Sequence, residues 1–163
     1  MKLTKDLLPK DNFLNIQNLL LGADFPWYLN EAGKSGTDPS LHNFQFTHTF
    51  YGNNQVHSSY YNDLLPLINT INPKSLIKIK ANITTVTDDI HYFDMHTDFD
   101  YECTTSVFYI NSNNGLTVFE NGEQNESIEN SLFEFNSLLK HTGTTSTDTK
   151  VRCLINLNYF KWI

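Results

Sequence analysis

Three side chains that can bind a metal ion lie in the C-terminal half of the sequence: His96, Asp98 and His141. Residues two apart on a β-strand project to the same face, so His96 and Asp98 would point the same way. A histidine from a distant strand would complete two imidazoles and one carboxylate on one side of an ion. This set leaves coordination positions open and is typical of non-haem Fe(II) centres. The His-x-Asp triplet alone is weak evidence, because a chain with six histidines and 18 acidic residues contains one easily by chance.

Arg152 follows His141 by eleven positions and lies in the last strand-like run of the chain. Every second residue from Val151 to Tyr159 is apolar, and Arg152 lies on the opposite face of that run. A guanidinium in a core strand needs an anionic partner, because an unpaired buried charge is very costly. The partner is either an internal carboxylate or the carboxylate of a bound organic co-substrate. A planar guanidinium can donate two parallel hydrogen bonds to such a carboxylate. Without the histidines, the internal salt bridge would be favoured.

The elements that must position these side chains are predicted to be helices first and strands afterwards. A helix is predicted over residues 11–21, with Asp11 as N-cap and Gly22 at its end. Residues 24–42 are predicted to form an irregular loop, because glycine, proline and polar residues cluster there. A second helix is expected to start near residue 62, which places Pro66 in its first turn.

Period-2 alternation of apolar residues dominates the rest of the chain. Strands are predicted over residues 44–51, 77–84, 91–96, 104–110, 116–120, 131–135 and 151–160, with turns at 113–115, 121–122 and 142–143. Many short strands without helices between them indicate a sandwich or barrel, one side of which the two helices would cover. We expect a single domain over residues 1–163. Residues 1–75 would be helical and loop support and 76–163 the core.

Composition excludes several classes of protein. Hydrophobic residues make up 39% of the 163 residues, which argues for a packed core. The net charge is −7 and no dense cluster of lysine or arginine occurs, which disfavours nucleic acid and anionic membranes as partners. No apolar run approaches the ~20 residues of a membrane span, and no apolar signal segment is expected at the N-terminus. Cys103 and Cys153 are predicted to be buried thiols, which suits a reducing cytoplasmic compartment.

The order of these motifs resembles that of the Fe(II)/2-oxoglutarate-dependent oxygenases, in particular small phage or bacterial members of the prolyl-hydroxylase-like branch. The similarity covers about residues 77–160 and includes the segments Phe-Tyr-Ile-Asn at 108–111, Asn-Gly-Leu-Thr-Val-Phe at 114–119, His-Thr-Gly at 141–143 and Val-Arg at 151–152. The chain departs from the family pattern at Asn114, where a first glycine is common, and at 148–150, where glycine is also common. Neither departure removes a ligand.

The resemblance implies a mainly β fold with N-terminal helices and a double-stranded β-helix core of the jelly-roll or cupin-like type. It implies that His96, Asp98 and His141 bind Fe(II) and that the protein is a dioxygenase, which uses O2 and 2-oxoglutarate and releases succinate and CO2. The hydroxylated substrate is not identified, and a protein or peptide side chain such as proline is what this branch suggests. The expected compartment is the cytoplasm, that of the host cell for a phage-encoded chain.

The resemblance also implies a site for the co-substrate. Arg152 would pair with the distal carboxylate of 2-oxoglutarate, and Tyr109 would donate a hydroxyl hydrogen bond to the same group. An ordinary core tyrosine explains Tyr109 equally well. Asn82 is a weaker candidate for a co-substrate contact, because the strand face that it shares with Lys78 and Lys80 is expected to meet solvent.

Two other functions remain open. A cupin-like metalloprotein of another reaction type would not need Arg152, which makes this residue the discriminating feature. A non-enzymatic jelly-roll module, such as a virion or carbohydrate-binding protein, would bind no metal at His96. His91 and Asp94 also lie near the triplet; odd spacing would place His91 opposite His96, whereas Asp94 would share its face.

Overall fold

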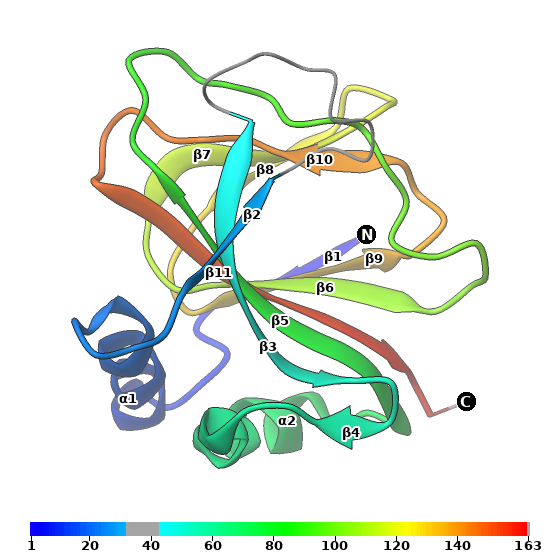
Figure 1. The fold of residues 1–163 in the computed structure, drawn as a ribbon. Coiled ribbons are helices and arrows are strands. Elements are labelled where there is room, and N and C mark those ends of the chain that lie inside the picture. The colour runs from blue at the N-terminus through cyan, green and yellow to red at the C-terminus, as the bar shows by residue number, and fades with distance from the viewer. Residues whose placement is uncertain (32–42, 163) are drawn as a thin grey trace.

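Two antiparallel sheets form the centre of the protein (Figure 1), which the computed structural model describes over residues 1–31 and 43–162. The larger sheet has the order β1-β9-β6-β11-β5-β3-β2, with β4 paired to β3, and the smaller sheet has the order β10-β7-β8. The strands of the larger sheet are β1 (Lys2–Thr4), β2 (Tyr28–Glu31), β3 (Phe44–Gly52), β4 (Gln55–Val56), β5 (Ser75–Thr85), β6 (Thr104–Tyr109), β9 (Ser131–Asn136) and β11 (Val151–Phe160). Those of the smaller sheet are β7 (Asn113–Phe119), β8 (Gln124–Ser127) and β10 (His141–Gly143).

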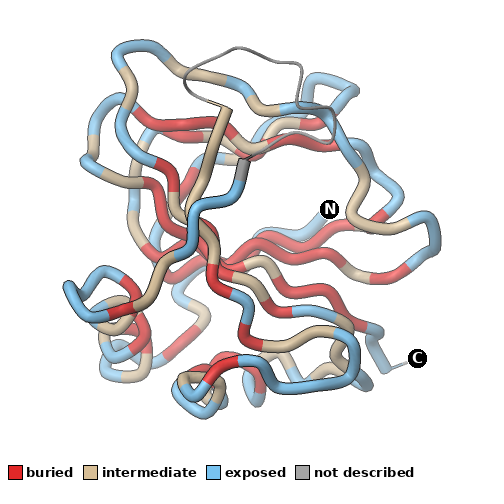
Figure 2. The backbone as a smooth tube through the Cα atoms, viewed as in Figure 1, coloured by how far each residue is buried: buried red, intermediate tan, exposed pale blue. Residues whose placement is uncertain are grey.

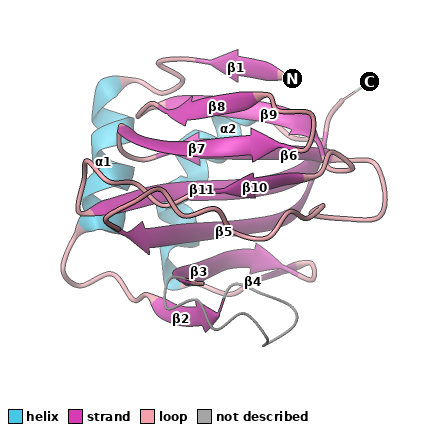
Figure 3. Ribbon diagram, turned by 90° about the horizontal axis from the view of Figure 1, so that it is seen from above, coloured by secondary structure: helices cyan, strands magenta, loops and turns pink. Residues whose placement is uncertain are grey.

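The helices and the smaller sheet lie on opposite sides of the larger sheet (Figures 1 and 3). Helix α1 (Lys10–Leu21) precedes β2, and the 3-10 helix η1 (Ser59–Leu64) leads directly into α2 (Leu65–Ile71). Pro66 lies in the first turn of α2, as predicted, where its missing N–H costs no intrahelical bond. The larger sheet is therefore the middle layer, and its two faces bury different sets of side chains.

The alternation along β11 separates these two sets. Ile155, Leu157 and Tyr159 face the helices and join a large apolar cluster that includes Phe13 of α1 and Leu67 of α2. The opposite face, here called the inner face, points toward the smaller sheet. It is lined by a second apolar cluster, formed by Val107, Tyr109, Phe119, Phe133, Phe135 and Leu154. The buried positions run along the central strands in Figure 2, and Arg152 belongs to the inner face.

The helices and most strands lie where the sequence predicts them, with local differences. Helix α1 begins one residue earlier than expected, and Pro9 precedes it, so Asp11 lies in its first turn and is not its N-cap. The predicted irregular loop over residues 24–42 contains strand β2, and residues 32–42 lie outside the described part of the chain. The short strands β1, β4 and β8 were not expected either.

Residues 91–96 do not form the predicted strand. They contain two isolated β-bridges, Tyr92 to Thr144 and His96 to His141. The predicted turns at 113–115 and 142–143 are also wrong, because these residues belong to β7 and β10. The turn at 121–122 fits, since Gly122 has a φ of +85°, which favours glycine.

Both cysteines are buried free thiols, as expected. Among residues 1–31 and 43–162, no helix has the length and apolar character needed to cross a bilayer.

Candidate metal centre and co-substrate site

The side chains of His96, Asp98 and His141 converge on one point between the two sheets. One ligand atom from each lies within 4.8 Å of the other two. Nε2 of each histidine is 3.8 Å from Oδ1 of Asp98, which is too long for a hydrogen bond. These are the three residues that the sequence selected, and the described residues contain no other such group of three or more His, Cys, Asp or Glu side chains.

Backbone pairing brings His96 and His141 together. The two residues exchange both of their backbone hydrogen bonds, at 3.0 and 2.9 Å. His141 is the first residue of β10, whereas His96 lies in the segment that replaces the predicted strand. Asp98 follows after a bend, so the same-face argument for residues 96 and 98 was wrong although the two side chains do meet.

Both imidazoles have a fixed tautomer. Nδ1 of His96 donates to the backbone carbonyl of Asp94, and Nδ1 of His141 donates to that of Leu139, each over 2.9 Å. A carbonyl oxygen can only accept, so each neutral ring keeps its proton on Nδ1 and its lone pair on Nε2. Burial lowers the pKa of His141, although the carbonyl of Leu139 and the charge of Asp98 oppose this, and a lower pKa favours the neutral form that binds metals. Hydrogen bonds to the far side of a ligand ring are the usual support of metal sites.

Asp98 is held by two side chains that sequence reasoning missed. Its Oδ2 accepts from the hydroxyl of Thr105 over 2.8 Å and from the amide of Asn158 over 2.7 Å. Oδ1 is left facing the histidines. Thr105 and Asn158 lie on the inner faces of β6 and β11, next to each other in the register. Their signal in the sequence is a polar residue at an inward position of a core strand.

Arg152 is a buried cation without an ionic partner. Its residue is 4% exposed, and no aspartate or glutamate of the described chain lies within ion-pair distance. Nε donates to Ser127, and Nη2 donates to the carbonyl of Leu116 over 3.2 Å, whereas Nη1 donates to no described residue. The internal salt bridge is therefore absent from the described structure. Burial lowers the pKa of this guanidinium, which expresses the cost of its charge.

Two glycines make room for this side chain. A Cβ on Gly115 would lie 2.4 Å from Cδ and 2.7 Å from Nε of Arg152, distances that no packed structure tolerates. A Cβ on Gly143 would lie 3.3 Å from Nη1 of the same residue. Both glycines belong to the segments on which the family resemblance rests, and the structure gives each a physical reason: the smaller sheet must approach the guanidinium closely.

Buried oxygen atoms without partners lie beside Arg152. Oδ1 of Asn82 and Oγ1 of Thr84 make no hydrogen bond within the described structure. Both residues are on the inner face of β5, where Thr84 pairs with Arg152 and Asn82 pairs with Leu154. Their residues are 7% and 5% exposed, so the expectation that this face meets solvent was wrong for both. Buried polar atoms normally form hydrogen bonds. Two buried oxygens without hydrogen bonds, next to a guanidinium without an ionic partner, therefore indicate a place for a polar ligand.

Tyr109 is fully buried on the inner face, and its ring lies next to the guanidinium of Arg152. Cζ of Arg152 is 5.9 Å from the centre of its ring. Its hydroxyl is 2.9 Å from Oγ1 of Thr117 and accepts from the amide of Asn125 over 3.1 Å. Burial raises the pKa of Tyr109, so the phenol keeps its proton.

His91 and Asp94, the other candidates near the triplet, have different positions. His91 is not among the three converging side chains. Asp94 supports His96 through its backbone carbonyl and not through its carboxylate.

No model of a known protein family matches the sequence, and no curated protein matches it significantly. Solved structures do match. A prolyl hydroxylase from Trichoplax adhaerens, in complex with a hypoxia inducible factor oxygen degradation domain peptide fragment, aligns with a TM-score of 0.66 and 13% identity over 98% of this chain and 83% of that one. A 2OG-Fe(II) oxygenase family protein from Burkholderia pseudomallei aligns with a TM-score of 0.64 and 13% identity, over 96% of this chain and 82% of that one. A Pseudomonas putida prolyl-4-hydroxylase aligns with a TM-score of 0.60 and 12% identity, over 99% of this chain and 92% of that one.

This chain has their double-stranded β-helix fold. The expected fold class, a mainly β protein with N-terminal helices and a jelly-roll core, is confirmed. At these identities the likeness concerns the fold, so the chemistry rests on the side chains described above.

Proposed function

We propose that this protein is a dioxygenase that binds Fe(II) through His96, Asp98 and His141. It uses O2 and 2-oxoglutarate to hydroxylate a substrate, with release of succinate and CO2. The observation that carries the proposal is Arg152, a buried guanidinium that lacks a carboxylate partner within the described structure. It lies on the inner face of the same barrel in which the three metal-binding side chains converge.

The donor set fits ferrous iron. Two neutral imidazole nitrogens and one carboxylate oxygen are the ligands of the facial triad, which leaves positions for a co-substrate and for dioxygen. Hydrogen bonds from Thr105 and Asn158 hold the carboxylate, and carbonyls hold the imidazoles. Bound iron would supply the redox chemistry that transfers an oxygen atom to the substrate. The part of the protein would be to hold these three ligands in place.

The inner face fits a molecule with a carboxylate at one end. Nη1 of Arg152 has free donors, and Oγ1 of Thr84 lies across the strand pair without a partner. Tyr109 would donate its hydroxyl hydrogen bond to the same carboxylate, and Asn82 would contact the co-substrate one inward position further along β5. The apolar side chains of Phe133 and Leu154 exclude water from this part of the barrel. A dry environment strengthens the pairing of guanidinium and carboxylate.

The test is an anaerobic titration with Fe(II) and 2-oxoglutarate, read by the visible charge-transfer band of the iron chelate, with His96→Ala as a matched variant. We expect a band in the natural protein and none in the variant. Folded protein that binds iron without a band would favour a cupin-like protein of another reaction type. Folded protein that binds no metal would favour a non-enzymatic jelly-roll module.

We also propose that the substrate is a protein or peptide side chain such as proline. The support is the Trichoplax adhaerens neighbour, which is a prolyl hydroxylase in complex with a peptide fragment. Incubation with proline-containing peptides under air, followed by mass spectrometry, would reveal the gain of one oxygen atom. Turnover of 2-oxoglutarate without oxidation of any such peptide would argue for a different substrate.

A further inference from the structure

A hollow of about 630 Å³ opens beside the candidate metal centre, and Asp98 and its anchor Asn158 form part of its wall. The turn between β3 and β4 and the first residues of β5, which pair with β11, form another part of its wall. The full lining consists of Thr49, Gly52, Asn53, Asn54, His57, Ser75, Leu76, Ile77, Lys78, Asp98, Phe99, Tyr101, Asn158 and Phe160. A molecule in this hollow would lie within reach of the metal ligands.

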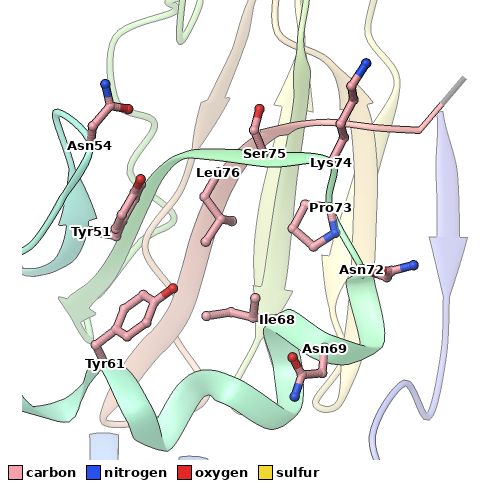
Figure 4. A pocket seen from close by; sticks show the side chains of 10 residues that line it. All are labelled: Tyr51, Asn54, Tyr61, Ile68, Asn69, Asn72, Pro73, Lys74, Ser75 and Leu76. Atoms are coloured by element: carbon pink, nitrogen blue, oxygen red, sulfur yellow. The ribbon is translucent and has the colours of Figure 1, made fainter.

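A second hollow of about 710 Å³ adjoins the first and shares Asn54, Ser75 and Leu76 with it. Figure 4 shows Tyr51 and Tyr61 on one side of this second hollow and Leu76 in its middle. The centres of these two tyrosine rings are 6.0 Å apart. The two hollows lie on different faces of the larger sheet, because Tyr51, Tyr61 and Leu76 pack against the helix-side cluster, whereas Lys78 and Asn158 pair on the inner face. The first hollow is the one that reaches Asp98.

The charge of the first hollow is opposite to that of the protein. The chain has a net charge of −7, yet among the described residues Asp98 is the only acidic one that lines either hollow. Lys74 lines the second hollow and Lys78 the first, and neither forms an ion pair with a described residue. Lys80 follows on the same face of β5, and burial and the charge of Lys78 lower its pKa. With Asp98 bound to a cation, Lys78 is the remaining lysine, arginine or carboxylate among the described residues that line the first hollow.

Aromatic rings form the other wall of the first hollow. The ring centres of Phe99 and Tyr101 are 5.0 Å apart. The rings of Tyr101 and Phe160 stack with their centres 6.4 Å apart and an angle of 19° between their planes. Tyr101 is 43% exposed and Phe160 is 41% exposed, so the rings present apolar surface to an occupant. Such a wall suits the side chains and backbone of a peptide.

We propose that the first hollow binds an acidic peptide, whose aspartate or glutamate side chain pairs with Lys78 while a neighbouring residue is presented to the metal. The inference names the class of substrate and in that respect rests on the proposed function. Single-stranded nucleic acid is the other polyanion that aromatic rings and lysines bind. It fits less well, because a net charge of −7 repels a row of phosphates.

The probes are two pools of fluorescein-labelled peptides of equal length, which differ in one component. Each randomised position holds equal parts of Gly, Ser, Pro, Leu and Glu in the acidic pool, and Gln replaces Glu in the neutral pool. Binding is measured by fluorescence anisotropy under nitrogen, with and without Fe(II) and 2-oxoglutarate. We expect the acidic pool to bind about two- to fivefold more tightly, the worth of one exposed ion pair. Added salt should reduce this preference.

The variant Lys78→Gln should abolish the preference, because it removes the charge at an exposed position and leaves the core intact. Lys10→Gln is the matched control, since Lys10 is also exposed and lines neither hollow. Equal binding of both pools, no binding of either, or a preference that survives in Lys78→Gln would overturn the proposal. Displacement of the acidic pool by lower concentrations of oligothymidylate would reassign the first hollow to nucleic acid. A Lys78-dependent preference in protein that shows no charge-transfer band would keep the peptide site and reject the oxygenase.

Discussion

At the scale of single residues, Arg152 is a buried charge that destabilises the ligand-free protein. Removing a charge from water costs several kcal/mol unless a counter-charge compensates it, and the described residues supply only neutral acceptors. A ligand carboxylate would supply the missing charge. Affinity for the co-substrate and instability of the ligand-free protein then have the same origin.

The variant Arg152→Met tests this origin. An apolar side chain of similar length removes the buried charge, so the melting temperature of the ligand-free protein should stay unchanged or rise. Affinity for 2-oxoglutarate should fall by about 100-fold, which corresponds to the loss of a charge-assisted pair of ~3 kcal/mol. Calorimetry with and without 2-oxoglutarate measures both effects. Equal losses of iron and co-substrate binding, together with a large drop in stability, would instead assign Arg152 a structural role.

Thr105 determines how well Asp98 is held. The variant Thr105→Val keeps the shape of the side chain but removes the hydroxyl that donates to Oδ2 of Asp98. Losing a hydrogen bond of this kind typically weakens metal binding 10–100-fold, so we expect a decrease within about that range. Titration with Co(II), followed by its visible spectrum, measures the affinity. Thr105→Ser should restore it, and an unchanged affinity in Thr105→Val would show that Asn158 alone is sufficient.

At the scale of elements, the approach of β7 to β11 depends on Gly115. The variant Gly115→Ala places a methyl group where Cδ and Nε of Arg152 now lie, so the guanidinium must move. We expect weaker binding of 2-oxoglutarate with nearly unchanged binding of metal, because the metal ligands lie elsewhere. Isothermal titration separates the two. Gly122→Asn is the control, since nothing lies within 4 Å of its added Cβ and asparagine tolerates a positive φ.

The strands that carry an alternating pattern were predictable, and the segment that carries His96 was not. β11 has the predicted bounds because its apolar face alternates without a break. Residues 91–96 also alternate loosely, but they pair only at two isolated bridges. Partners on the same face of distant strands, such as Thr84 beside Arg152, depend on the register between strands. A single sequence does not contain that register, so the orphaned oxygens could not be foreseen.

At the scale of the whole molecule, Glu134 joins the two ends of the chain. Its side chain is buried in β9, with Oε2 3.8 Å from Nζ of Lys2 and Oε1 2.9 Å from Nζ of Lys161. Oε1 also accepts a hydrogen bond from the hydroxyl of Tyr159 over 2.7 Å. Burial opposes ionisation, but the hydrogen bonds and the two lysines outweigh it and hold the pKa of Glu134 below its ordinary value. We propose that residues 1–163 act as one domain, because β1 to β3 of the N-terminal part belong to the same sheet as β11.

This contact gives stability a dependence on pH. A carboxyl whose pKa is lower in the folded state stabilises the protein above its unfolded pKa of about 4.3, and this contribution is lost as the pH falls through the lower folded value. Urea denaturation should therefore show wild type more stable than Glu134→Gln near pH 7, with the difference disappearing in acid. Glu126→Gln is the control, because it removes an exposed carboxylate for which no hydrogen bond to the side chain is seen among the described residues. A constant difference between wild type and Glu134→Gln would refute the contribution of charge.

The uneven exposure of the two histidines affects how a metal would enter and leave. The side chain of His96 is 50% exposed, whereas those of His141 and Asp98 are 8% and 16% exposed. His96 also lies outside the regular strands, in a segment attached by bridges, while the other two are fixed from within the barrel. Release would start by swinging out one solvent-facing ligand while the barrel stays folded. A metal ion bound by these three side chains would therefore exchange while the protein stays folded, and a chelator would remove it at a rate set by the movement of His96.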